Sequence, residues 1–394
     1  MRRLRRAAAL IILAPAILSA GCGGLTSRAA APAVAGHAAG AAVRFVPPSL
    51  ATSLAAPGAT WAAVPMGAVA GPNLFWQLFM FPSAGTRWSL VTPPDIATNG
   101  ALILADPGEH ALVTGVRPSL YLAYSPITST RDGGRSWATA PPVAAGLANI
   151  PDALAAAPDG QLIALDRAGQ AELTGRGHAS WTGLTSERSL AATPAGRGCA
   201  LTGLTAAAYA PTGMPLLAGT CTHPGQAGVF TKTGGAWHAA GPVLPASLAG
   251  QTVHVLRLTR IGTRNVALLE AGTGPAASLL AAWTADGGSR WTLSPLFRLE
   301  GSQVLSASFG NGGAAAVVLN GNHGETLAGP GASWRRLPAL PPGNTVTLAL
   351  AATGGIGALA ADGSKLTAWQ LAPGSVAWAK TQAINVPIQY GSSS

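Results

Sequence analysis

Residues 152–181 read DALAAAPDGQLIALDRAGQAELTGRGHASW, and this stretch decides the fold. Four short runs rich in apolar residues are separated by Asp159-Gly160, by the polar link 166–169 and by a glycine-rich turn. Apolar runs of this length between breaks of Gly and Asp are typical of β-strands joined by tight turns. The stretch therefore predicts four antiparallel strands connected by three hairpin turns.

The same pattern recurs along the chain. In seven places a glycine stands two to four positions before a tryptophan, and these tryptophans follow one another at intervals of 43 to 56 residues. They are Trp88, Trp137, Trp181, Trp237, Trp291, Trp334 and Trp378. A glycine-containing turn precedes each of them, so two markers repeat in phase. A repeat of this period indicates a solenoid, an array or a propeller.

The second strand of the repeat is apolar almost throughout, as in 265–270 (NVALLE), 314–320 (AAAVVLN) and 355–361 (GIGALAA). A strand with this composition is buried on both faces of its sheet. Sheets stacked face to face around an axis bury both faces, whereas a half-exposed sandwich does not. We therefore predict an all-β fold, a seven-bladed β-propeller of four-stranded antiparallel blades that spans residues 43–394.

Two turns carry a more specific motif. Residues 130–137 (TRDGGRSW) and 284–291 (TADGGSRW) resemble the Asp-box, or BNR repeat, of the sialidase superfamily, and 231–237 (TKTGGAW) is a degenerate copy without the acid. The motif positions are Asp132, Gly134, Trp137, Asp286, Gly288 and Trp291. The resemblance implies a structural turn between the third and fourth strands of a blade, on the rim away from any active site.

The overall composition excludes two other classes of protein. The chain has 394 residues, of which 51 are Gly and 31 are Pro, too many for the long uninterrupted helices of a bundle. With 48% hydrophobic and only 10% charged residues, the chain does not have the composition of a disordered protein.

The N-terminus predicts export. Four arginines in the first six residues precede an apolar run, 7–20, which is shorter than the roughly 20 residues of a membrane span. The sequence 18–22 (LSAGC) resembles a bacterial lipobox, which implies lipidation of Cys22, for example with palmitate. We expect a lipoprotein signal peptide at 1–21, a flexible Ala/Gly/Pro tether at 22–42 and a lipid-anchored protein on the extracytoplasmic face of the cell membrane. If the lipobox is not used, the protein is secreted.

The three cysteines are consistent with this interpretation. Lipidation of Cys22 leaves Cys199 and Cys221, and an exported protein permits a disulfide between them. The seven histidines show no metal-ligand spacing, so we predict no metal site and no cofactor.

Charge limits the possible partners. Without the four arginines of the signal, 20 basic residues face 14 acidic ones, and they are scattered along the chain. This pattern argues against nucleic-acid binding and allows a mild attraction to anionic lipid or cell-wall polymer. The predicted partners are the membrane, through the N-terminal lipid, and a protein or glycan of the cell envelope.

Catalysis is the less favoured reading. Sialidases use an arginine triad, a Tyr–Glu couple, an Asp acid/base and an Arg-Ile-Pro motif, and this chain has no Arg-Ile-Pro sequence. Other glycosidases need two carboxylates at a defined separation, whereas Asp132, Asp159 and Asp286 lie in predicted turns. We assign no catalytic residue and favour a non-catalytic binding protein. A divergent, sialidase-like glycoside hydrolase and an assembly or stability factor for a membrane complex remain alternatives.

The strand order also suggests where a ligand would bind. If the Asp-box turns join strands three and four, the links between strands two and three lie on the opposite, upper rim. The candidate binding residues of that rim are Asp166, Arg167, His223, Glu270, His323 and Asp362. The alternative is that these loops are polar only because they meet water.

Overall fold

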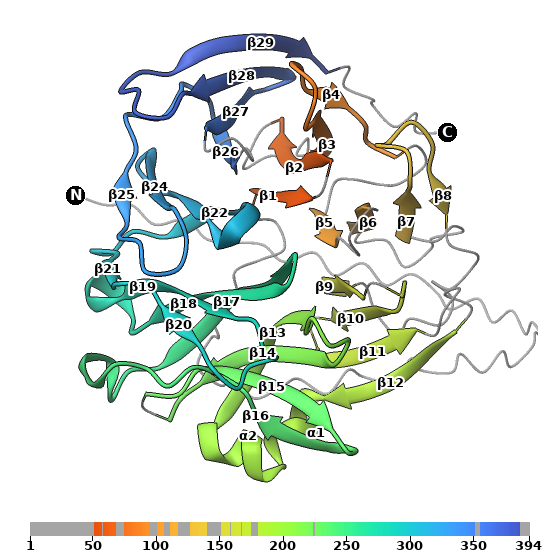
Figure 1. Cartoon of the computed structure of the whole chain (residues 1–394), viewed down its shortest axis with the longest axis vertical. Helices are drawn as coiled ribbons and strands as arrows, with labels where there is room; N and C mark the ends of the chain where they lie inside the picture. Colours follow the sequence, from red (N-terminus) through yellow and green to blue (C-terminus); the bar gives the residue numbers. More distant parts are fainter. Residues whose placement is uncertain are drawn as a thin grey trace, which may run out of the picture. The chain divides into compact units, whose positions relative to one another are not determined.

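Short β-strands make up nearly all of the regular structure. The computed structural model describes residues 51–56, 58–67, 75–93, 101–105, 111–116, 127–139, 151–157, 159–166, 168–174, 180–223, 225–350 and 355–386. Within these ranges the strands pair in consecutive sets of four, which are called units 1 to 7 below (Figure 1). The prediction of an all-β chain is confirmed.

The first three units have these strands. Unit 1 contains β1 (Ala51–Ala56), β2 (Ala59–Met66), β3 (Phe75–Pro82) and β4 (Ser89–Leu90). Unit 2 contains β5 (Ala101–Ala105), β6 (Ala111–Val116), β7 (Ile127–Thr130) and β8 (Ala138–Thr139). Unit 3 contains β9 (Pro151–Ala156), β10 (Leu162–Asp166), β11 (Gln170–Thr174) and β12 (Trp181–Ser186).

Two helices, α1 (Glu187–Ala191) and α2 (Pro194–Cys199), stand between units 3 and 4. Unit 4 contains β13 (Leu201–Tyr209), β14 (Pro215–Cys221), β15 (Gly228–Thr233) and β16 (Ala236–Ala239). Unit 5 contains β17 (Val253–Ile261), β18 (Arg264–Ala271), β19 (Ser278–Thr284) and β20 (Thr292–Leu293), and β21 (Phe297–Arg298) also pairs with β19.

The last two units follow the same order. Unit 6 contains β22 (Val304–Phe309), β23 (Ala315–Leu319), β24 (His323–Leu327) and β25 (Arg335–Arg336). Unit 7 contains β26 (Thr345–Leu350), β27 (Ile356–Asp362), β28 (Lys365–Leu371) and β29 (Ala379–Asn385). Short 3₁₀ helices occur at Ala246–Leu248, Gly274–Ala276 and Asn311–Gly313.

Two of the sheets contain more than one unit, which differs from the expectation of separate four-stranded sheets. Strand β1 pairs in parallel with β22, so units 1 and 6 share an eight-stranded sheet, and β14 pairs with β17, so units 4 and 5 share a nine-stranded one.

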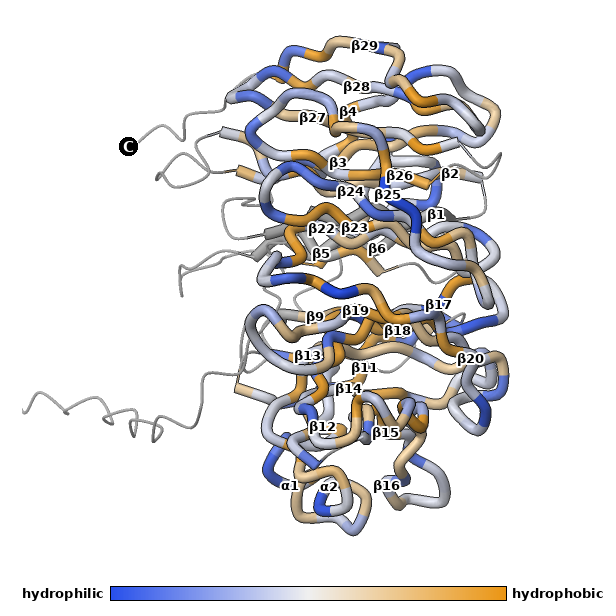
Figure 2. The backbone as a smooth tube through the Cα atoms, turned by 90° about the vertical axis from the view of Figure 1, so that its left-hand side faces the viewer, coloured by the Kyte–Doolittle hydropathy of each residue, from blue (hydrophilic) through white to orange (hydrophobic). Residues whose placement is uncertain are grey.

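Hydrophobic clusters join the units. In the described part of the chain each of seven clusters combines residues of two units, as Leu216 of unit 4 packs with Val255 and Leu269 of unit 5. Six clusters join consecutive units, and the seventh joins unit 7 to unit 1 through residues such as Leu359 and Phe79. The order of contacts along the chain is therefore circular. Hydrophobic residues follow strands such as β19 and β22, and hydrophilic ones fall mainly on the turns (Figure 2).

The repeated tryptophans occupy equivalent places in these clusters. Each one packs in the cluster between its own unit and the unit before it, and Trp88 of unit 1 packs against unit 7. One ring thus covers each boundary between units, and a large aromatic side chain gives each boundary a wide apolar contact.

Units 1 and 7 are also linked by hydrogen bonds. The Gln382 side chain donates to the Trp88 carbonyl oxygen at 3.0 Å and accepts from the Trp88 backbone N–H at 2.9 Å. The Gly67 N–H donates to the Gly363 oxygen at 2.9 Å. The sequence also offers two segments that could pair across the first and last units, 43–46 and 384–388; the first lies outside the described residues, and Ile384 pairs with Leu366 inside unit 7. Among the described residues, no helix is long and apolar enough to span a membrane.

Candidate functional site

Each unit has two edges that differ in how the strands are connected. At the lower edge the first strand turns into the second and the third into the fourth; at the upper edge the second strand leads to the third, and one unit leads to the next. Lower edges of neighbouring units lie together, since Asn265 Nδ2 donates to the Tyr209 carbonyl at 2.8 Å and Trp283 Nε1 to the Gly313 carbonyl at 2.7 Å.

Two lower-edge turns have nearly identical hydrogen bonds. Between β7 and β8, Thr130 Oγ1 donates to Asp132 Oδ1 at 2.9 Å and accepts from the Gly134 N–H at 2.9 Å. Asp132 Oδ1 also accepts from the Ser136 N–H at 2.9 Å, and Ser136 Oγ donates to Oδ2. These donors hold the pKa of Asp132 at about 2, chiefly through the Ser136 hydroxyl. The carboxylate therefore fastens its own turn.

The turn between β19 and β20 repeats this arrangement. Thr284 Oγ1 donates to Asp286 Oδ1 at 2.8 Å, and the Arg290 N–H donates to the same oxygen at 3.0 Å, which lowers the pKa of Asp286. Gly288 has a φ of +105°, and a Cβ on it would lie 2.6 Å from the Ala240 carbonyl oxygen, so only glycine fits. Trp291 Nε1 donates to that same oxygen at 2.7 Å.

The upper edge holds the predicted binding residues in two environments. Asp166 and Glu270 are only 6% and 7% exposed, whereas His223, His323 and Asp362 are exposed. Arg167 lies outside the described residues.

Both aspartates of this set take part in local hydrogen bonds. Asp166 Oδ1 accepts from the Gln170 N–H at 2.8 Å across the turn between β10 and β11. Asp362 Oδ1 accepts from Asn344 Nδ2 at 2.9 Å, which ties the end of β27 to the segment before β26. These two contacts stabilise the backbone at the upper edge.

The helical segment α1–α2 is the main departure from the repeat. Ser186 caps α1 by accepting from the Ser189 N–H, and Thr193 caps α2 by accepting from the Gly196 N–H, each at 3.1 Å. A Cβ on Gly196 would lie 2.1 Å from the Leu190 oxygen, so the two helices pack with their backbones in close contact. Leu190 is fully buried, which fixes the segment onto units 3 and 4.

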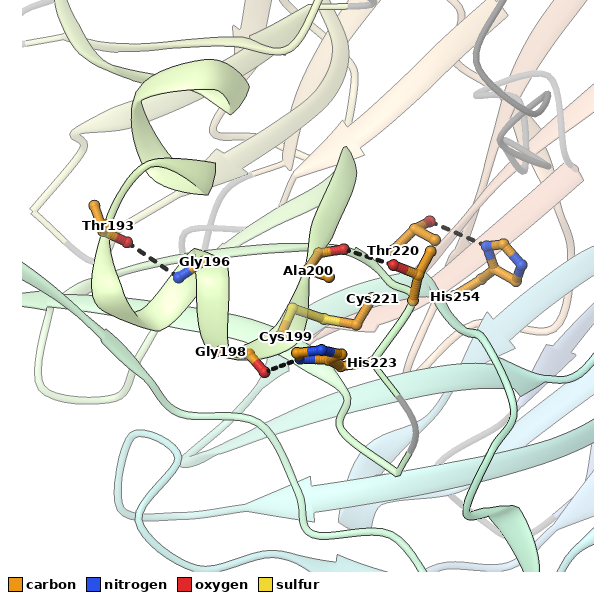
Figure 3. The surroundings of a disulfide bond; sticks show 10 residues. Thr193, Gly196, Gly198, Cys199, Ala200, Thr220, Cys221, His223 and His254 are labelled. Carbon is orange, nitrogen blue, oxygen red and sulfur yellow. Dashed lines mark hydrogen bonds between the residues drawn. A yellow bond between two sulfur atoms is a disulfide. The ribbon is translucent and has the colours of Figure 1, made fainter.

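A disulfide joins this segment to β14, which confirms the predicted bridge between Cys199 and Cys221 (Figure 3). The chain on either side of the bridge is also paired. The His223 N–H donates to the Cys199 oxygen at 3.1 Å, His223 Nδ1 lies 2.7 Å from the Gly198 oxygen, and Thr222 Oγ1 donates to the Ala200 oxygen at 3.1 Å. The connection between β12 and β13 is thus held at several points.

Next to the bridge a row of polar side chains crosses three strands. Thr220 of β14 pairs with His254 of β17, which in turn pairs with Glu270 of β18. Thr220 Oγ1 lies 3.0 Å from His254 Nδ1 (Figure 3), and all three residues are at most 7% exposed. Since directly paired residues extend from the same side of a sheet, the row places polar groups side by side where units 4 and 5 merge.

Unit 6 adds a second polar group toward the upper edge. Arg336 Nη2 lies 2.6 Å from His323 Nδ1, so the guanidinium donates and that ring nitrogen accepts. Glu325 is paired with Arg336 across β24 and β25 and is 5% exposed. Burial raises the pKa of Glu325, and the positive charge of Arg336 opposes that rise.

The predicted rim residues differ in exposure and in the unit that carries them. Asp166 and Glu270 are buried, and the exposed groups His223, His323 and Asp362 come from three different units. Within the described ranges no cluster of His, Cys, Asp and Glu fits a metal ion. The exposed imidazole of His223, beside the fixed helical segment, can form hydrogen bonds to a macromolecular partner.

Sequence reasoning missed two features of the upper edge. The α1–α2 segment has readable helix-start signals in Ser186 and Thr193-Pro194, which the repeat pattern obscured. The pair between Thr220 and His254 joins residues of different units, and no local sequence pattern predicts it.

Comparisons with known proteins concern the fold. The sequence matches no family model and no curated protein. The structure is similar to a candidate 6-phosphogluconolactonase from Bacteroides uniformis, with TM-score 0.52 and 12% identity over 84% of this chain and 98% of that one. YCF48 from Cyanidioschyzon merolae gives TM-score 0.48 and 14% identity over 84% and 98% of the two chains. A fungal lectin from Aleuria aurantia, described as a six-bladed β-propeller with a fucose recognition mode, gives 0.38 and 14% over 87% and 96%.

At these identities the likenesses concern the fold alone. Consecutive sets of antiparallel strands, each packed on the next, are the architecture of a β-propeller, and this is the fold of the chain.

Proposed function

We propose that this protein is an exported, lipid-anchored and non-catalytic β-propeller of seven blades, and that its upper edge binds a partner protein of the cell envelope. Export and anchoring rest on the signal-like N-terminus and on Cys22. The binding role rests on the upper edge of units 3 to 5, where the chain departs from its repeat.

Support for seven blades comes from a coincidence of three repeats. Seven strand sets, seven hydrophobic clusters and seven equivalent tryptophans occur in the described part of the chain, and the last cluster returns to unit 1. We infer that each unit is one blade. We also infer that the turns around Asp132 and Asp286 are Asp-boxes, since their hydrogen bonds agree with a role in shaping the turn.

The observation that carries the binding proposal is the α1–α2 segment. A propeller needs only a short link between units, yet here the link contains two capped helices, a buried leucine and a disulfide. A surface loop held in one conformation loses little entropy when it binds, and such preorganisation favours protein recognition. Arg188 and Arg197 of the segment and the adjacent His223 are exposed.

Photo-crosslinking in producing cells tests the upper edge. A photoreactive amino acid is placed at Arg188 or His223, and at Arg264 of the lower edge as a matched control on an exposed basic residue. We expect a discrete protein adduct from the two upper positions only. Protein adducts from the control alone contradict the proposal. Hydrolysis of a glycan panel by the purified protein contradicts the non-catalytic assignment.

Anchoring is tested by Cys22→Ser. We expect the variant to leave the membrane fraction after a wash in concentrated salt, because it lacks the acyl chain and salt screens electrostatic contacts. Retention of the washed variant on membranes contradicts the lipoprotein assignment.

A further inference from the structure

Beyond a partner at the upper edge, we propose that the lower edge binds an anionic lipid surface. The observation behind this is a set of basic side chains in the lower-edge turns of units 1, 2, 4 and 5. The set, called the basic edge below, consists of Arg87, Arg131, Arg135, Lys232, Arg264 and Arg290.

The five arginines of the basic edge are exposed to solvent. Within the described residues, none of the five guanidinium groups has a hydrogen bond or an ion pair. Lys232 lies over the Trp237 ring, with Nζ 5.8 Å from the ring centroid. A charge that makes no internal contact adds nothing to the fold and remains available to a ligand.

The acids of the same edge do not neutralise it. Among the described residues these acids are Asp132, Asp159 and Asp286, so six positive charges face three negative ones. Asp132 and Asp286 turn their carboxylate oxygens toward the N–H and O–H groups of their own turns. Both carboxylates are exposed and keep their negative charge, so these nine groups leave the lower edge with a net charge of +3.

The balance of charged side chains at the upper edge has the opposite sign. Its described acids are Asp166, Glu187, Glu270, Glu300, Glu325 and Asp362, and its described cations are Arg188, Arg197, Arg298, Arg336 and Lys365. Six acidic side chains therefore face five basic ones. The positive potential of the protein is concentrated on one edge, and a dipolar distribution of this kind orients a protein in front of a charged surface.

The spread of the charges favours a bilayer over a linear polymer. The basic residues come from four units and mark no single groove or strand along which a polymer could run. A flat anionic surface meets all of them at once. Val376, in the corresponding turn of unit 7, is 86% exposed and adds an apolar side chain that can enter the headgroup region.

The chemistry of recognition follows from the side chains. A guanidinium donates two parallel hydrogen bonds to a phosphate group, so a layer of phospholipid headgroups is a good acceptor for arginines. The attraction acts within a Debye length of about 8 Å at physiological salt, and concentrated salt abolishes it. Binding in this orientation turns the upper edge, with its helical segment, away from the membrane.

Vesicle binding tests the proposal independently of any protein partner. The Cys22→Ser chain, which carries no lipid, is mixed with vesicles of phosphatidylglycerol and phosphatidylcholine in equal parts, or of phosphatidylcholine alone, and the bound fraction is measured by sedimentation. We expect binding only to the anionic vesicles and a loss of this binding in concentrated salt.

Two matched triple variants locate the surface. Arg87, Arg135 and Arg290 are changed to Gln in one, and Arg188, Arg298 and Lys365 of the upper edge are changed to Gln in the other, so both lose the same charge. Since each basic residue near an anionic membrane strengthens binding about fivefold, we expect the lower-edge variant to bind about a hundredfold more weakly and the upper-edge variant to change little. A lower-edge Arg→Lys triple keeps the charge and should keep the binding.

Three results overturn the proposal. The first is equal binding of the two Gln variants, and the second is equal binding to charged and neutral vesicles. The third is binding of the chain to a soluble anionic polysaccharide with no binding to anionic vesicles, which assigns the basic edge to a polymer. None of these results bears on the protein adducts expected at the upper edge.

Discussion

The turn carboxylates of the lower edge and the upper edge of units 3 to 5 are held in place by different kinds of contact. The hydrogen bonds of the turn carboxylates are local, as when Asp286 accepts from the N–H of Arg290 four residues later. The upper edge of units 3 to 5 is also held by links between distant segments, as in the disulfide between Cys199 and Cys221 and the contact between Thr220 and His254. The same turn can therefore form in different units, because it depends only on residues of that turn. The links at the upper edge of units 3 to 5 depend on how those particular units pack together.

The largest effect is expected from the lower-edge tryptophan that covers a boundary between units. Trp291→Ala removes the ring packed between units 4 and 5 and leaves the Ala240 carbonyl without its donor. We expect a loss of about 3–5 kcal/mol in the free energy of unfolding, measured in urea. Trp291→Phe keeps most of the apolar contact and should cost only about 1 kcal/mol.

The exposed Val376→Ala serves as the control for Trp291, and it should leave the free energy of unfolding unchanged within about 0.5 kcal/mol. If Trp291→Ala costs no more than this control, the tryptophans do not hold the boundaries between units together.

The next largest loss of stability is expected at the upper edge. Replacing Cys199 and Cys221 together by Ser opens a loop with a sequence separation of 22 residues. The chain-entropy estimate gives a loss of about 3 kcal/mol in the free energy of unfolding. Hydrogen exchange should show the loss concentrated in α1, α2 and the start of β13, because the bridge fixes that segment. Faster exchange spread evenly over all units would contradict a local role.

The difference between the edges also explains what could be predicted from sequence. A tryptophan equivalent to Trp291 occurs in all seven units, and Gly288 belongs to a motif that occurs in full twice. The repeat therefore predicts their roles as packing and turn residues. The bridge follows from a count of cysteines. The row of Thr220, His254 and Glu270 is not readable, because it depends on β14 pairing with β17, and this pairing joins two units with no repeated signal.

The parallel pair of β1 and β22 was equally hidden, because it joins units whose sequences are about 250 residues apart. Likewise Glu270 was predicted to line a rim, yet it is buried. Alternation along a strand shows which residues share a face, but not how closely the next unit covers them.

A smaller effect comes from the turn carboxylates of the lower edge. Hydrogen bonds lower the pKa of Asp132 to about 2, below the ordinary value of 3.8. The stability that this carboxylate contributes is therefore present above pH 3.8 and is lost as the pH falls toward 2. In Asp132→Asn this part of the acid dependence should be absent. Thermal unfolding midpoints measured at a series of pH values between neutrality and 2 test this, and parallel curves for the two proteins would contradict it.

The smallest effect has the opposite sign and belongs to the buried carboxylate of unit 6. Because burial raises the pKa of Glu325 above its ordinary value of 4.5, the folded protein favours the protonated acid, and the stability it contributes is present below pH 4.5 and lost as the pH rises. Glu325→Gln should therefore be more stable than the wild type at neutral pH, and the gain should disappear in acid. Arg336→Gln removes the charge that opposes the rise and should increase the gain from Glu325→Gln. A Glu325→Gln variant whose advantage grows in acid would show that Glu325 behaves like the carboxylates of the lower edge, and that the two edges do not differ in this respect.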